Sequence, residues 1–132
     1  MHNAYHTNNQ GASKDQSIEQ EIQAKGLNAP RITPDDIERT ISCEHTFTVG
    51  NALRALGHPT ADAFDLLTIC ALKLVNGFTV TGESACASPE NFDAEIGRKI
   101  ARQNAIEKIW PLEGYLLKSK LAGHLVVGVE LI

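Results

Sequence analysis

The stretch that decides the fold is DLLTICALKLVNGFTVTGES, which runs from Asp65 to Ser84. Two runs rich in Leu, Ile, Val, Thr and Phe flank the dipeptide Asn76-Gly77. An Asn-Gly pair between such runs is the strongest short-range signal for a β-hairpin, because both residues of a two-residue turn need a positive φ. The sequence therefore predicts a hairpin that turns at these two residues.

A two-residue turn also fixes the register of the predicted hairpin. The cross-strand pairs would be Val75–Phe78, Lys73–Val80 and Ile69–Ser84. One face would carry Leu67, Ile69, Ala71, Val75, Phe78 and Val80, and the other face Leu66, Cys70, Leu72 and Leu74. A lone hairpin cannot bury two apolar faces, so either helices cover both sides or a second subunit covers one. We therefore expect the chain to form a homo-oligomer.

A long helix is predicted directly after the hairpin, in SPENFDAEIGRKIARQNAIEKIW, residues 88–110. Ser88 suits the N-cap and Pro89 the first helical position, and acidic residues follow in the first turn. The buried stripe is expected to consist of Phe92, Ile96, Ile100, Ile106, Ile109 and Trp110. Pro111 cannot continue a straight helix, so we expect a kink or a break there, with a second short helix that ends near Gly123.

The residues before the hairpin also indicate helical structure. In RITPDDIERTIS, residues 31–42, Thr33 can serve as N-cap and Pro34 fits the first helical position. The following CEHTFTV is compatible with a continued helix or with a short strand, and GNALRALG is typical of one or two helical turns closed by Gly57. The predicted class is α+β, with the hairpin packed against a long C-terminal helix kinked at proline and an N-terminal helical segment.

The two ends of the chain differ from this core in composition. Residues 1–29 are polar and contain few large apolar groups, so we expect a flexible tail, although SIEQEIQAK could form a short helix against a partner. The last segment, HLVVGVELI, is expected to be a strand or an apolar tail. Residues 30–132 are expected to form one domain.

Composition and charge exclude several classes of function. The chain has 132 residues and a formal net charge of −4, which argues against general nucleic-acid binding because that needs a basic surface. The start has no secretory signature, and no apolar run approaches a membrane-spanning length. The cysteines Cys43, Cys70 and Cys86 lack the paired spacing of a disulfide framework, so we expect reduced thiols in a cytoplasmic protein.

The sequence contains no metal, cofactor or catalytic motif. CEH, residues 43–45, holds two potential ligands, but a structural zinc site needs four, and glycine-rich phosphate loops are absent. Ser84, Cys86 and Ser88 are candidate nucleophiles without a histidine near them in the sequence, although the fold could bring His45 close. We therefore predict no metal, no cofactor and no catalytic residue.

The loop between the hairpin and the helix is the candidate binding site. A helix that starts at Ser88 would present unpaired backbone N–H groups and the positive end of its dipole to an anion. Small residues would let a phosphate approach the backbone, and arginines of a neighbouring subunit could complete the pocket. The candidate ligand-binding residues are Glu83, Ser84, Ser88, Asn91, Arg98 and Arg102. The alternative is that Ser-Pro-Glu only caps the helix.

The run NGFTVTGESACASPENFDAEIGRKIARQNAIEKIWPLEGYLL resembles the hallmark of a family of small tailed-phage and prophage proteins. The family is named after gene products of phages N-four and Sf-six. The resemblance covers roughly Leu66 to Leu121, and ITPDDIERTIS resembles the opening segment of the family. It implies a phage accessory protein that acts inside an infected bacterium, and it implies no reaction.

Two functions from different classes fit these features. The first is a non-enzymatic binder that sequesters a nucleotide-type defence signal. It is suggested by the anion-ready loop, the two arginines, the expected oligomer and the phage context. The second is a protein-binding module that inhibits or redirects a host protein. It is suggested by the acidic net charge, the polar tail and the absence of a catalytic constellation. A cleft at a subunit interface is expected for the first, and a flat exposed patch for the second.

Overall fold

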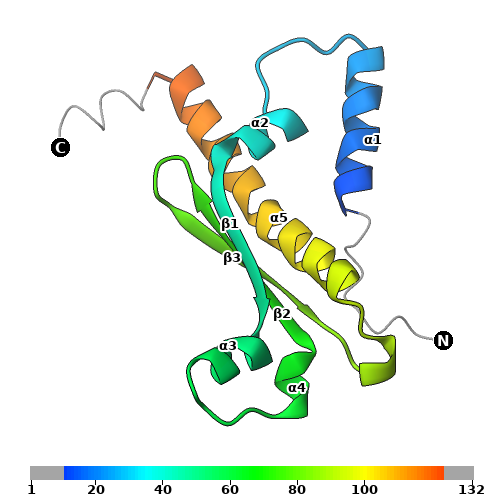
Figure 1. The fold of residues 1–132 in the computed structure, drawn as a ribbon. Coiled ribbons are helices and arrows are strands. Elements are labelled where there is room, and N and C mark those ends of the chain that lie inside the picture. Colours follow the sequence, from blue (N-terminus) through cyan, green and yellow to red (C-terminus); the bar gives the residue numbers. More distant parts are fainter. Residues whose placement is uncertain (1–10, 124–132) are drawn as a thin grey trace.

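The computed structural model describes residues 11–123, with side chains from Lys14 onward. Three antiparallel strands form one sheet in the order β1-β2-β3, and the long helix α5 lies across one face of it (Figure 1). The elements in chain order are α1 (Gly11–Ala24), α2 (Pro34–Thr40), β1 (Ile41–Thr48), α3 (Val49–Ala55), α4 (Asp62–Asp65), β2 (Leu67–Leu74), β3 (Thr79–Ala85), the 3-10 turn η2 (Pro89–Asn91) and α5 (Ala94–Leu121). The predicted α+β class is confirmed.

The hairpin is present, but its register differs by one residue from the predicted one. Lys73 pairs with Thr79, and Leu72 pairs with Val80, so the predicted Lys73–Val80 pair is wrong. Because side chains alternate along a strand, a slip of one residue moves every side chain of β3 to the opposite face of the sheet.

The loop of the hairpin explains the slip. It runs from Val75 to Gly77, since the Leu74 N–H donates to the Phe78 carbonyl at 2.7 Å. Gly77 has a φ of 89°, whereas no residue other than glycine has a positive φ in the described part of the chain. Asn76 instead accepts a hydrogen bond from the Phe78 N–H through its side chain, at 2.9 Å. A three-residue loop needs a positive φ only at its last residue, and glycine supplies it there.

The observed register decides which side chains α5 buries. Val80 joins Cys70, Leu72 and Leu74 on the covered face, and all four are at most 8% exposed. We call the opposite side of the sheet the open face. By strand register it carries Cys43, His45 and Phe47 of β1, Leu67, Ile69, Ala71 and Lys73 of β2, and Thr79, Thr81 and Glu83 of β3. The short helices α3 and α4 lie at one end of the sheet (Figure 1).

The backbone of α5 lies directly against Gly82 of β3. A Cβ atom at this position would fall well inside van der Waals contact of the Ala101 carbonyl oxygen and the Ala105 nitrogen, and 2.8 Å from the Asn104 carbonyl carbon. Ala101 and Ala105 are themselves fully buried. Only glycine leaves enough room for two backbones to approach this closely.

The buried stripe of α5 mixes large and small residues. Ile100, Ile106 and Ile109 are buried as predicted, whereas Ile96 is 41% exposed. The stripe also contains small residues that the predicted stripe lacks, namely Gly97, Ala101 and Ala105. They recur at every fourth residue, so they lie along one side of the helix. This side can approach the sheet because its side chains are short.

The long helix begins later than predicted. Ser88 precedes only the short turn η2, and its side chain makes no capping hydrogen bond. The N-cap of α5 is Asp93, whose side chain accepts a hydrogen bond from the Ile96 N–H at 3.0 Å. Both Ser88 and Asp93 are good N-cap residues in the sequence, and the extended backbone of Phe92 separates the two turns.

The predicted second helix after Pro111 is absent, because α5 continues through this residue to Leu121. A proline inside a helix removes one backbone donor and crowds the preceding turn. The last buried residue of α5 is Ile109, so Pro111 follows the part of the helix that packs on the sheet. The helix tolerates it on an exposed turn.

The segments before β2 follow their sequence signals. Thr33 and Asp36 form a capping box at the start of α2, with hydrogen bonds of 3.1 and 2.8 Å. The ambiguous segment after α2 is the edge strand β1.

Helix α1 occupies part of residues 1–29, for which we expected a flexible tail. Arg31 donates hydrogen bonds to the Glu19 carboxylate of this helix at 2.5 and 2.8 Å. The domain boundary at residue 29 stays a prediction, and HLVVGVELI lies outside the described residues.

Replacing Gly82 by alanine should be among the most damaging small substitutions in this chain. Because the new methyl group would meet backbone atoms of α5 that cannot rotate away, we expect a loss of about 3 kcal/mol or more in the free energy of unfolding. The control is Gly114→Ala in α5, where no atom lies within 4 Å of the added carbon. This control should stabilise by about 0.5–1 kcal/mol. Urea unfolding of both variants measures the difference, and equal stabilities would contradict the close contact.

Candidate functional site

The six residues predicted to bind a ligand do not form one cluster in the chain. Glu83 lies on the open face and is exposed, whereas Ser84 points to the other face and is 1% exposed under α5. The Ser84 hydroxyl has no hydrogen-bond partner among the described residues. Since neighbouring residues on a strand point to opposite faces, these two side chains cannot contact the same small ligand within one chain.

Ser88 and Asn91 belong to the turn that precedes α5. The Ser88 carbonyl accepts hydrogen bonds from the Cys86 thiol at 3.1 Å and from the Asn91 N–H at 3.1 Å. The carboxylate of Asp93 caps the first turn of α5, so the α-helix begins after Asp93 and not at Ser88, where an anion was expected. The predicted start of the long helix at Ser88 is therefore wrong, whereas the binding of an anion by Ser88 and Asn91 stays a prediction.

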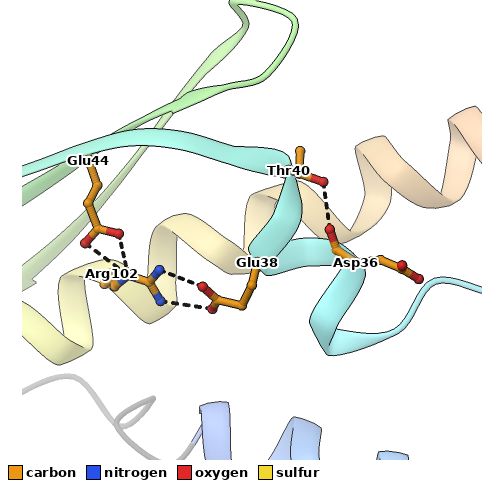
Figure 2. Close-up of polar contacts among 5 residues, drawn as sticks. All are labelled: Asp36, Glu38, Thr40, Glu44 and Arg102. Atoms are coloured by element: carbon orange, nitrogen blue, oxygen red, sulfur yellow. Dashed lines mark hydrogen bonds and ion pairs between the residues drawn. The ribbon is translucent and has the colours of Figure 1, made fainter.

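Arg102 is held between two carboxylates (Figure 2). Its Nε atom donates to both carboxylate oxygens of Glu44 at 3.0 and 3.1 Å, and its two terminal nitrogens donate to Glu38 at 3.1 and 2.9 Å. These bonds raise the pKa of Arg102 and lower that of Glu38. Arg102 thus ties α5 to α2 and β1, and two acids already satisfy its charge.

Arg98 lies in a different environment, at the wall of an open cavity of about 210 Å³. We call this cavity the Arg98 pocket. It is formed where β1, α3 and the start of α5 meet, and its walls are Thr46, Phe47, Thr48, Asn51, Thr68, Phe92, Ala94 and Arg98. Of the six predicted residues, only Arg98 lines this cavity.

The guanidinium of Arg98 is held by an exposed ion pair that is easily broken. It donates to Glu95 at 2.5–3.1 Å through Nε and Nη2, and the two side chains are 42% and 59% exposed. An exposed ion pair within one helix contributes little to stability. Glu95 raises the pKa of Arg98, so the side chain stays cationic while it can turn toward a ligand at small cost.

The remaining walls offer polar groups and aromatic rings. Thr48 Oγ1 accepts from the Asn51 N–H at 3.2 Å, and Asn51 Oδ1 accepts from Arg54 at 3.1 Å. The Thr48 hydroxyl hydrogen and the Asn51 Nδ2 group take no part in these two bonds. Phe47 is 40% exposed, so its ring is accessible at the rim of the pocket.

Arg98 was among the residues predicted from the sequence, whereas the threonines of the pocket were not. Thr46 and Thr48 alternate in β1, so they lie on one face of the strand, and this pattern was available in the sequence. Thr68 of β2 lines the pocket because it pairs with Thr48 of β1. That register comes from tertiary pairing, so sequence spacing could not indicate it.

A second cavity of about 250 Å³ lies between α1 and the helices α2 and α5. Its walls are mostly apolar and include Ile18, Ile22, Ile32 and Trp110. The Glu19 carboxylate, which also lines this cavity, accepts two hydrogen bonds from Arg31. Within residues 11–123, no group of three or more His, Cys, Asp or Glu side chains is arranged to hold a metal, and no helix is long and apolar enough to cross a membrane.

Glu38→Gln should change how stability depends on pH. Because Arg102 lowers the pKa of Glu38 in the fold, this carboxylate stabilises the protein above its unfolded pKa, and the contribution is lost as the pH falls through the lowered value. We expect Glu38→Gln to cost about 0.5–1 kcal/mol at neutral pH and almost nothing in acid, where Glu38 is protonated.

Thermal unfolding of both proteins between about pH 3 and pH 7 measures this effect. The exposed Glu21→Gln, which removes an i, i+4 pair with Lys25, is the control and should leave the curve nearly unchanged. A constant difference between wild type and Glu38→Gln at every pH would contradict the role of the Arg102 contact.

Comparison with known proteins agrees with the resemblance noted in the sequence. The model of the Phage protein (N4 Gp49/phage Sf6 gene 66) family matches residues 32–121, which extend from just before α2 to the end of α5. No curated protein and no solved structure matches the chain. The matched range contains the whole sheet, the Arg102 contacts and the Arg98 pocket. Since it spans well over half of the 132 residues, the chain belongs to the phage protein family of N4 Gp49 and Sf6 gene 66.

Proposed function

We propose that this chain is a non-catalytic phage accessory protein that sequesters a small anionic ligand of nucleotide type in the infected bacterial cell. The observation that carries the proposal is the composition of the Arg98 pocket. One accessible guanidinium, threonine hydroxyls, an asparagine amide and two phenylalanine rings line the same cavity.

These groups match the parts of a nucleotide. An arginine binds phosphate oxygens through a planar pair of donors, which is stronger than a neutral hydrogen bond. Hydroxyl and amide groups such as those of Thr48 and Asn51 suit the oxygens of a sugar. The exposed ring of Phe47 offers a surface on which a base can stack.

The size of the cavity indicates how such a ligand would lie. Its volume of about 210 Å³ is below the roughly 300–1,000 Å³ of sites that enclose a whole drug-sized molecule. The pocket would therefore take the phosphate and sugar, while the base extends over the rim at Phe47. A second subunit could cover the part that remains exposed.

The lining of the pocket favours binding over turnover. Its described walls contain no histidine, cysteine or carboxylate, and a serine- or threonine-type nucleophile needs a base within hydrogen-bond reach. A protein that holds a signalling nucleotide without converting it would act by lowering the free concentration of that signal.

A thermal-shift screen with nucleotides, cyclic dinucleotides and ADP-ribose derivatives tests the proposal. A ligand present at about a hundred times its dissociation constant should stabilise the protein by about 2.7 kcal/mol. We expect Arg98→Ala to abolish the shift without lowering the melting temperature of the free protein, because the side chain makes only an exposed ion pair.

Two matched variants sharpen the result. Arg39→Ala removes an exposed arginine that also pairs with an acid three residues earlier, Asp36, and it should retain the shift. Glu95→Gln removes the acid that competes for Arg98 and should increase the affinity. Lack of a shift with any compound, or an equal loss in Arg98→Ala and Arg39→Ala, would refute the proposal.

The alternative function, a module that binds and inhibits a host protein, has one feature in its favour. The tip of the hairpin exposes two large apolar side chains, Val75 at 67% and Phe78 at 53%. If the ligand screen fails, a pull-down from bacterial lysate with the wild type and with a Val75→Ser/Phe78→Ser variant compares this surface directly.

A further inference from the structure

The open face carries a pair of side chains that the Arg98 pocket does not use. Cys43 and His45 lie two residues apart on β1, so both point to the same side of the strand. The Cys43 sulfur is 3.6 Å from Nε2 of His45, and both residues are exposed. Cys43 is the exposed cysteine of the three, since Cys70 and Cys86 are buried.

The distance between these two atoms equals the distance between two ligand atoms that bind one tetrahedral zinc ion. Zinc binds thiolate sulfur at about 2.3 Å and imidazole nitrogen at about 2.0–2.1 Å, which at a tetrahedral angle places the two donors about 3.6 Å apart. The strand therefore presents one sulfur and one nitrogen donor at the correct spacing without any rearrangement of the backbone.

A closed zinc site needs four ligands, and the described part of one chain supplies two of them here. No third His, Cys, Asp or Glu joins the pair within residues 11–123. The neighbouring Glu44 is engaged with Arg102 on the covered side of the sheet. The two missing ligands lie outside these described residues, and a second molecule can supply them.

The surroundings of the pair favour a second copy of this chain as that molecule. The open face also carries the exposed Phe47 and the half-buried Ile69 and Ala71, and α5 packs on the opposite face of the sheet (Figure 1). Sheets stack about 10 Å apart, so a metal midway would lie about 5 Å from each strand, within reach of cysteine and histidine side chains. Because a two-fold axis repeats every contact, one copy of the pair brings the other two ligands automatically.

The position of the pair along β1 suits such an arrangement. The strand runs from Ile41 to Thr48, and the pair flanks its middle. A two-fold axis between Cys43 and His45 would therefore lay the two sheets over each other along most of their length. Lys73, the cross-strand neighbour of Cys43, is exposed, and its long stem can carry the ammonium group to the rim.

We propose that Cys43 and His45 form half of a zinc site, which a second copy of the chain completes as Cys2His2 between the open faces of two sheets. Two thiolates and two neutral imidazoles balance the charge of the zinc ion. The inference does not depend on the proposed nucleotide binding, although Phe47 belongs both to the open face and to the rim of the Arg98 pocket.

Cobalt and zinc titrations of the full chain, reduced and freed of metal with a chelator, test this site. Tetrahedral Co²⁺ bound to thiolate gives a charge-transfer band in the near ultraviolet and strong visible bands. We expect both to saturate at one metal per two chains. Zn²⁺ should displace the cobalt and convert monomer to dimer in sedimentation velocity, and chelator should reverse the conversion.

Variants separate this site from adventitious binding. Cys43→Ser should abolish the charge-transfer band, and His45→Gln should weaken metal binding at least tenfold. His58→Gln, at an exposed histidine outside the sheet, is the matched control and should bind metal like the wild type. Absence of the band, its persistence in Cys43→Ser, or saturation at one metal per chain without dimerisation would each overturn the proposal.

Discussion

The contact between α5 and Gly82 is the constraint on which the rest of the structure depends. The helix rests on the backbone of β3 because neither side has a side chain in the way: Gly82 below, with Ala101 and Ala105 above. Contact at one point sets the height of the helix over the whole sheet. The larger residues Leu72, Ile100 and Ile109 then fill the space on either side. Interiors are close-packed, so a change of one methyl group at the closest point propagates to all of these contacts.

Sequence reasoning reached the class of fold and missed the details that depend on competition between local signals. The N-cap at Thr33 has no rival nearby, and its prediction holds. At the hairpin, Asn76 could adopt a positive φ or bond to the backbone through its side chain, and it does the second. At α5, Ser88 and Asp93 both suit an N-cap, and only the packing of the helix decides between them. These two misses, at the hairpin and at the start of α5, shift an element along the sequence and leave its type unchanged.

The candidate site shows the same limit for charged residues. Arg98 and Arg102 lie one helical turn apart and are equivalent in the sequence. Among the described residues, Arg102 pairs with Glu38 and Glu44 from two other elements, whereas Arg98 pairs with Glu95 of its own helix. Acids far away in the sequence thus decide which arginine remains accessible. No spacing rule contains that information, since the acids arrive through the α2–β1 connection.

The uneven burial of α5 has a consequence for how the helix forms. Its 28 residues span about 42 Å at 1.5 Å per residue, yet the last buried side chain is Ile109. Within residues 14–123, the final three turns contribute no buried side chain to the core that could nucleate them. They are ordered by propagation from the anchored half, since adding a residue to an existing helix avoids the cost of nucleation. Order in this segment should therefore decay from Pro111 toward Leu121, with amide hydrogens exchanging faster along the way, while the anchored turns exchange only when the whole protein unfolds.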